Sequence, residues 1–124
     1  MSWNEPPPEV RREMNRILGE DIYLRAQRAW ERARQADPDV ILESWFRTPA
    51  RQRELGGATY SQHPLGTAVD LVQRDAAKRA AIVEALRREG FWVQERGRRV
   101  HVQAIHPEWF QRVLPQILAA GLYR

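Results

Sequence analysis

Helical and strand-like patterns of apolar residues occupy separate segments of this 124-residue chain. Apolar residues recur at helical spacing in five segments, 9–18, 21–35, 48–55, 75–88 and 107–120. Short strand-like runs lie at 40–46, 67–72, 91–94 and 100–103. This order of elements predicts an α+β fold in which a small antiparallel sheet is packed with helices.

Length and composition indicate one globular domain. The chain is 43% hydrophobic and 29% charged, which excludes disordered and collagen-like classes. It has no cysteine, so disulfides, a catalytic thiol and a cysteine-based zinc finger are all excluded. Within 1–124 we expect a helical N-terminal cover over 1–40, a core over 41–104 and a C-terminal helix over 105–124.

The charge balance favours an anionic partner. The formal net charge is +4 and the sequence pI is about 10.3, with Lys78 as the only lysine. An arginine excess also follows from genome base composition, so it does not identify the partner. The tryptophans fall mostly at core-like positions rather than on an arginine-rich face, so we expect no nucleic-acid partner.

The sequence predicts neither a membrane span nor a signal peptide. No apolar run approaches the roughly 20 residues that a span needs, so we expect no stable membrane insertion. The segment 1–8 has no basic region followed by an apolar one. We therefore expect a chain made in the cytoplasm that acts there or on the cell wall after release.

The histidines suggest a metal site. His63 lies in a loop before Gly66, and a strand follows in which Asp70 points away from the face expected to join the core. His101 lies on a second strand with apolar neighbours on the opposite face. Two histidines and a carboxylate form the three-ligand pattern of a catalytic zinc with one open position. His106 begins the last helix and is not predicted to be a ligand.

Two motifs give the chain a family resemblance. The first is Ser44-Trp45-Phe46-Arg47-Thr48-Pro49; the second is Ser61-x-His63-x-x-Gly66-x-Ala68-x-Asp70, followed later by His101-Val102. Over about 41–103, the chain resembles the M15 zinc peptidases, and the SxHxxGxAxD motif is matched at every fixed position. These include D-Ala-D-Ala carboxypeptidases, D-Ala-D-Ala dipeptidases and phage L-Ala-D-Glu endopeptidases. The resemblance implies a hedgehog/DD-peptidase-like fold.

The resemblance also implies roles for individual residues. The zinc ligands would be His63, Asp70 and His101. Arg47 would bind a substrate carboxylate or carbonyl, and a guanidinium fork suits that task. Ser61 would hydrogen-bond the substrate or support the site, although a turn-capping role fits it as well. Arg99 stands where family members often carry a second histidine; it would stabilise an oxyanion or simply be exposed.

The general base is the main departure from the family pattern. Many members place a Glu or Asp three residues before the last histidine, where this chain has Arg98. The nearest acid is Glu95, our candidate base. A three-residue loop over 96–98 would pair Val93 with His101, line Glu95 and Arg99 up with His101, and turn Trp92 into the core. Alternatively, Glu95 is a surface acid paired with arginine.

The sequence therefore predicts a zinc-dependent metallopeptidase that hydrolyses an amide bond in peptidoglycan stem peptides. Either a D-Ala-D-Ala carboxypeptidase or an L-Ala-D-Glu endopeptidase fits, and a small basic chain suits an endolysin-like enzyme that meets anionic cell-wall polymers. We expect a monomer. The alternatives are a non-catalytic zinc-binding module of the same fold and a cytoplasmic D-Ala-D-Ala dipeptidase. A nucleic-acid binder fits least well.

Overall fold

The computed structural model of the chain describes residues 5–124. The described elements are α1 (Pro8–Leu18), α2 (Ile22–Ala36), β1 (Ile41–Ser44), α3 (Pro49–Glu54), the 3-10 helix η1 (His63–Leu65), β2 (Ala68–Val72), α4 (Ala76–Arg88), β3 (Trp92–Arg96), β4 (Arg99–Gln103) and α5 (Pro107–Ala119). The predicted α+β class is confirmed. Positions 1–4 of the expected N-terminal cover lie outside the described residues.

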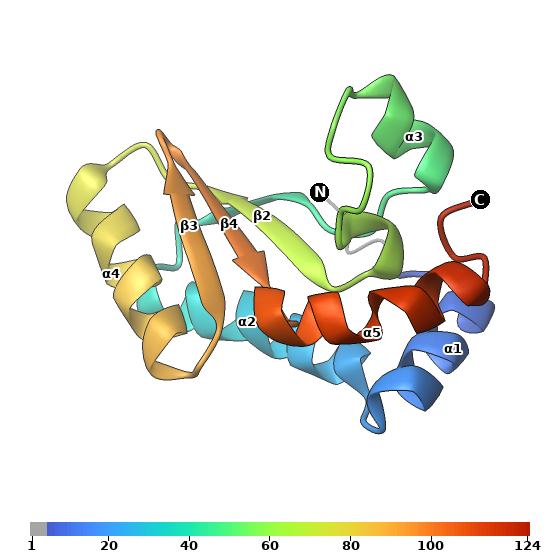
Figure 1. Cartoon of the computed structure of the whole chain (residues 1–124). Helices are drawn as coiled ribbons and strands as arrows, with labels where there is room; N and C mark the ends of the chain where they lie inside the picture. The colour runs from blue at the N-terminus through green and yellow to red at the C-terminus, as the bar shows by residue number, and fades with distance from the viewer. Residues whose placement is uncertain (1–4) are drawn as a thin grey trace.

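The strands form one antiparallel sheet in the order β1-β2-β4-β3 (Figure 1). Its two central strands bury one row of side chains in the core: Val69, Leu71, Val100 and Val102. The alternation of side chains along a strand puts Asp70 and His101 on the other face, where they lie directly opposite each other. One face of the β2–β4 pair therefore packs in the core, and the other face carries a polar cluster.

Helices α2 and α4 cover the apolar face of the sheet. The side of α2 that enters the core carries alanines at 26, 29 and 33, and their small size permits close packing. On α4 the buried residues include Ile82 and Leu86, both completely enclosed. The polar residues Asp70 and His101 lie on the opposite face of the sheet.

The helices begin and end within one residue of the predicted bounds. Pro8 starts α1, and Gly19 ends it in the left-handed conformation with φ of +74°. Asp21 and Asp75 precede α2 and α4, and each carboxylate accepts a hydrogen bond from a backbone N–H of the first turn. These caps fix the two helices that support the sheet.

Helix α5 closes the core against α1. Its buried face carries Phe110, Val113 and Ile117, and the facing α1 contributes the completely buried Met14. Figure 1 shows α5 lying alongside α1. No helix in the described part of the chain is both long and apolar enough to traverse a bilayer.

The turn between β3 and β4 differs from the predicted three-residue loop. It has two residues, Gly97 and Arg98, and Gly97 has φ of +60°. This conformation suits a two-residue hairpin turn with glycine at its first central position, a geometry that matches the twist of the strands. The register therefore pairs Gln94 with His101, and the predicted pairing of Val93 with His101 is wrong.

This register also turns Glu95 away from His101. Glu95 pairs with Val100, and its carboxylate contacts Arg79 Nε of α4 at 2.5 Å. Trp92, which we expected in the core, lies on the face of His101, with ring centroids 6.2 Å apart. The physical reason is that Val93 enters the core instead, opposite Val102. One residue of register thus decides which side chains reach the polar face.

We predict that Ile117→Ala lowers the free energy of unfolding by about 2–5 kcal/mol, because it opens a cavity where Ile117 is completely buried. The neighbouring Leu118 is 39% exposed, so Leu118→Ala serves as the matched control, with a loss of less than about 1 kcal/mol. Urea unfolding followed by circular dichroism measures both. Equal losses would show that α5 does not close the core.

Candidate metal centre

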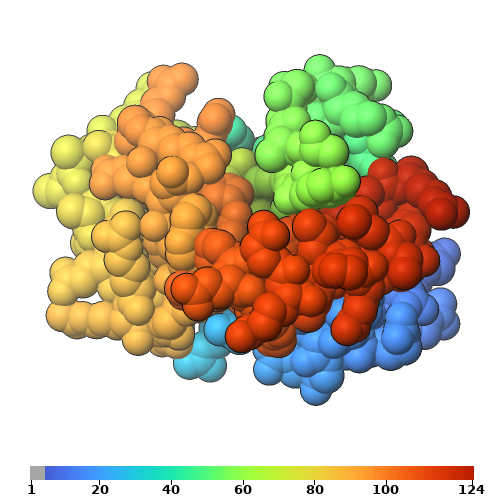
Figure 2. Space-filling view, in the orientation of Figure 1, coloured from blue at the N-terminus to red at the C-terminus, as the bar shows by residue number. Residues whose placement is uncertain are grey.

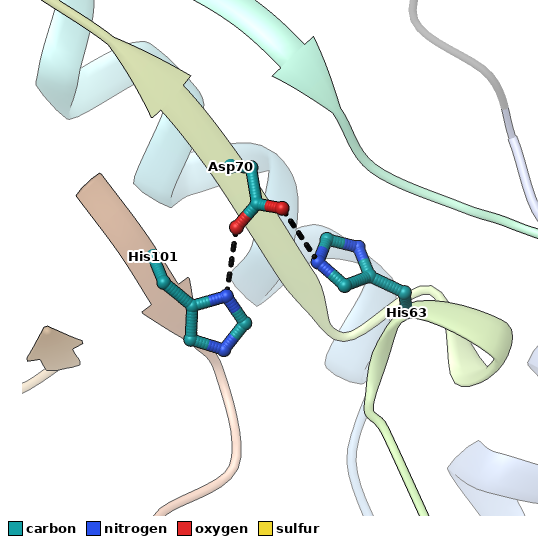
Figure 3. Close-up of side chains that lie close together, drawn as sticks. All are labelled: His63, Asp70 and His101. Atoms are coloured by element: carbon teal, nitrogen blue, oxygen red, sulfur yellow. Dashed lines mark hydrogen bonds and ion pairs between the residues drawn. The ribbon is translucent and has the colours of Figure 1, made fainter. Parts of the chain in front are cut away.

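His63, Asp70 and His101 converge on the face of the sheet opposite α2 and α4 (Figure 3). All three are buried, and one ligand atom from each lies within 4.8 Å of the others. His101 Nδ1 is 2.7 Å from Asp70 Oδ1, and His63 Nε2 is 3.1 Å from Asp70 Oδ2. The structure thus brings together the three residues that the sequence motif singled out.

The turn before β2 positions His63. Gly66 has φ of +72°, a left-handed conformation that ends the short helix η1 and starts the approach to β2. Trp45 Nε1 donates a hydrogen bond of 2.6 Å to the carbonyl of Gly66. Gln62 adds a second buried tie, donating to the carbonyl of Ile105 at 2.8 Å. His63 is therefore carried on a turn that is fixed at several points.

The hydrogen bond at the other nitrogen of His63 fixes its tautomer. Nδ1 lies 2.6 Å from the carbonyl oxygen of Trp45, which can only accept, so Nδ1 carries the proton. Nε2 then presents a lone pair, and this buried atom has no hydrogen-bond partner among the described residues. It faces the carboxylate of Asp70, which is also an acceptor. Two acceptors placed together in a buried site fit a cation between them.

His101 has the same kind of support. Its Nε2 lies 3.0 Å from Gln103 Oε1; when Nε2 donates a hydrogen bond to that amide oxygen, Nδ1 carries a lone pair and faces Asp70. Burial raises the pKa of Asp70, but the hydrogen bonds and positive charge that the imidazoles of His101 and His63 supply in their protonated form outweigh burial and hold this pKa well below its usual value. Asp70 is therefore an anion.

Arg47 hydrogen-bonds both a candidate metal ligand, Asp70, and a residue of α3, Gln52. Its Nη2 donates to Asp70 Oδ2 at 3.1 Å, and its Nη1 donates to Gln52 Oε1 at 3.0 Å. Gly57 leaves room for the Gln52 amide, since a Cβ there would lie 2.0 Å from Nε2. Each terminal nitrogen of a guanidinium carries a second hydrogen, so Arg47 keeps donors for a further partner.

A cavity of about 420 Å³ opens over the three residues. One wall comes from the α3 segment, with Gln52 and Tyr60, and the other from the β3–β4 hairpin, with Arg96 and Arg99. Figure 2 shows the notch between these two parts of the surface. The cavity lining includes three arginines, at 47, 96 and 99, and two carboxylates, at 43 and 70, so its charged side chains carry a small excess of positive charge.

Of the other predicted site residues, Ser61 and Arg99 line the cavity and Glu95 does not. Ser61 lines the cavity, but its hydroxyl accepts the backbone N–H of His63 at 3.1 Å, so it also caps the turn. Arg99 lines the cavity and forms an ion pair with Glu43 at 2.6 Å. Glu95 is not brought to the cavity. His106 precedes α5 as its exposed N-cap residue.

Gln52, Gln103 and Glu43 also line this cavity, although the sequence assigned them no role in the site. Gln52 follows Arg47 by five positions, and Gln103 follows His101 by two, so the alternation of β4 was a usable signal. Glu43 adjoins the arginine motif but lies at an irregularity of β1 that its sequence does not reveal.

Comparison with known protein families gives an independent match. The model of the family described as Peptidase M15 matches residues 17–107, well over half of the chain. The chain belongs to the peptidase M15 family. The match begins upstream of the segment 41–103 on which the motif resemblance rests, so it takes in the whole of α2. No curated protein and no solved structure matches the chain.

Membership of the M15 family identifies the chain as a peptidase-family protein, and the buried His63, Asp70 and His101 are the residues that could hold its metal. The donor set of this M15 member is suitable for such an ion. Two imidazoles and a carboxylate are ligands of catalytic metal sites that keep an open position. The buried Nε2 of His63, which has no hydrogen-bond partner among the described residues, is the observation that fits these three ligands to a metal ion.

We predict that Gly66→Ala destabilises the fold by more than the roughly 1–2 kcal/mol cost of a left-handed alanine, because its Cβ would lie 2.8 Å from Pro6 Cγ. Gly90→Ala is the matched control: its φ is +88°, but nothing lies within 4 Å of the added Cβ. Thermal and urea unfolding compare the two variants. If Gly66→Ala proved no worse than Gly90→Ala, the contact with Pro6 would carry no energy.

Proposed function

We propose that the chain is a zinc-dependent peptidase that hydrolyses an amide bond in peptidoglycan stem peptides, and that it acts as an endolysin-like enzyme on the cell wall. The observation that carries the proposal is the set of buried acceptors. His63 Nε2 has no hydrogen-bond partner among the described residues and faces the carboxylate of Asp70 beneath an open cavity. Nitrogen and carboxylate donors at an open position favour zinc.

The chain's own residues would orient the substrate. Zinc held by His63, Asp70 and His101 would polarise the scissile carbonyl and activate water. Arg47 would bind a free substrate carboxylate through its remaining N–H groups, and Arg99 would stabilise negative charge that develops on the carbonyl oxygen. Because the cavity opens to the surface, it would admit a peptide attached to a polymer.

The small excess of positive charge in the cavity supports an anionic substrate. Stem peptides present a free carboxylate near the scissile amide both at a terminal D-Ala and at a γ-linked D-Glu. A carboxypeptidase and an endopeptidase therefore both fit the position of Arg47. The net charge of +4 supports contact with anionic wall polymers, which favours a wall enzyme over a cytoplasmic dipeptidase.

A non-catalytic zinc-binding module is the second candidate, and one observation favours it. Glu95, the base expected from the sequence, is paired with Arg79 and lies outside the cavity. A module of this kind would bind zinc and the stem peptide without releasing products. Mass spectrometry of digested walls distinguishes the two candidates, because only a peptidase yields new amino and carboxyl termini.

We predict that the purified protein binds about one zinc per chain and that His63→Ala abolishes binding, because it removes one of three ligands. Elemental analysis measures the metal, and the turbidity of purified cell walls is followed alongside. His106→Ala is the matched control, since His106 is an exposed helix cap away from the ligands. Absence of zinc from the wild type after reconstitution would contradict the proposal.

We predict that Arg47→Ala raises the KM for stem peptides about 10- to 100-fold. It removes a charge-assisted interaction worth about 1.5–3 kcal/mol, and each 1.4 kcal/mol is a factor of about ten. Arg51→Ala is the control, because Arg51 is exposed and pairs with Glu54. Steady-state hydrolysis with zinc content measured in parallel gives the result. A loss in kcat with KM unchanged would place Arg47 outside substrate binding.

A further inference from the structure

Peptide hydrolysis needs a group that takes a proton from water and passes it to the leaving nitrogen. Among the described residues, the carboxylates that line the cavity are Asp70 and Glu43. Asp70 is already engaged, with His101 Nδ1 at 2.7 Å from Oδ1 and Arg47 Nη2 at 3.1 Å from Oδ2. That leaves Glu43.

A β-bulge brings Glu43 to the cavity. Leu42 pairs with Leu71 and Ser44 pairs with Asp70, so Glu43 is the extra residue between two consecutive pairs. Such bulges redirect side chains and are common beside active sites. Leu42 remains in the core, whereas Glu43 is intermediate in exposure and lines the cavity.

Arg99 holds the carboxylate of Glu43 in place. Arg99 Nη2 lies 2.6 Å from Glu43 Oε1, and Arg99 is on the same strand face as His101, two residues before it. None of the described residues hydrogen-bonds Glu43 Oε2. The glutamate side chain keeps 34% of its surface exposed, so a molecule in the cavity can reach it.

We propose that Glu43 is the proton-transfer residue of this site, an inference that rests on the proposed peptidase function. One proton of the attacking water moves to Glu43 Oε2 as the water oxygen bonds to the carbonyl carbon. The proton then passes to the amide nitrogen as the C–N bond breaks, giving one carboxyl and one amino product. Glu43 ends as it began, and one water is consumed.

The decisive experiment compares glutamate variants of the zinc-loaded protein on a stem peptide. Glu43→Gln lowers kcat about 10²- to 10⁴-fold, the usual contribution of a general base, with zinc content and melting temperature unchanged. Added formate restores part of the rate of Glu43→Ala, which loss of an ion pair alone would not allow. The matched control is Glu84→Gln, because Glu84 pairs with Arg88 at 2.6 Å on the exposed side of α4.

Two results would overturn the assignment: an unchanged kcat in Glu43→Gln, or an equal loss in Glu95→Gln. A readout independent of catalysis is the pH titration of the visible spectrum of the cobalt(II)-substituted protein. Glu43→Gln moves its midpoint to lower pH, because a negative neighbour no longer opposes loss of a proton near the metal; Glu84→Gln does not. If the wild type hydrolyses no stem peptide, the proposed function is wrong. The placement of Glu43 near the metal is tested separately: it is wrong if Glu43→Gln leaves the midpoint of the cobalt(II) titration unchanged.

Discussion

The antiparallel pairing of β2 with β4 is the constraint on which the rest of the structure depends. It sets Asp70 opposite His101 on one face while Leu71 and Val100 pair on the other. A shift of one residue in either strand would exchange these faces and drive a carboxylate into the core. Because burying an unpaired charge costs several kcal/mol, about as much as a whole domain's net stability, stability and site geometry specify the same register.

The polar face concentrates hydrogen-bond acceptors that are not matched by donors. The carbonyl of Trp45 accepts a hydrogen bond from His63 Nδ1, and the amide oxygen of Gln103 is placed to accept one from His101 Nε2. Both imidazoles are thereby oriented to present lone pairs near the anionic Asp70. Arg47 supplies part of the missing positive charge. The supporting residues thus organise the ligands before any ion arrives, which is the usual task of groups behind metal ligands.

Periodicity predicted the elements, and the SxHxxGxAxD motif together with the later His101 predicted the metal-ligand residues, because each rests on local patterns. The strand 67–72 and the run 100–103 alternate cleanly, so their inward and outward faces could be assigned without a structure. The β3–β4 register could not be, because Trp92 and Val93 are both suited to a core and the turn could include two or three of residues 96–98. Glycine at the first turn position was the usable signal. Glu43 lay beyond prediction, since a bulge is set by the pairing of β1 with β2.

The two walls of the cavity are held by different forces. The sheet wall is backed by close-packed apolar side chains, whereas in α3 the buried residue is the polar Gln52, which reaches Arg47 and the carbonyl of Ala58. Figure 1 shows α3 standing clear of the rest of the fold. Packed cores resist deformation, and short polar ties yield more readily. The sheet wall of the cavity is therefore the stiffer of the two. The α3 wall deforms more readily, and it is linked to the site through Arg47, whose guanidinium also contacts Asp70.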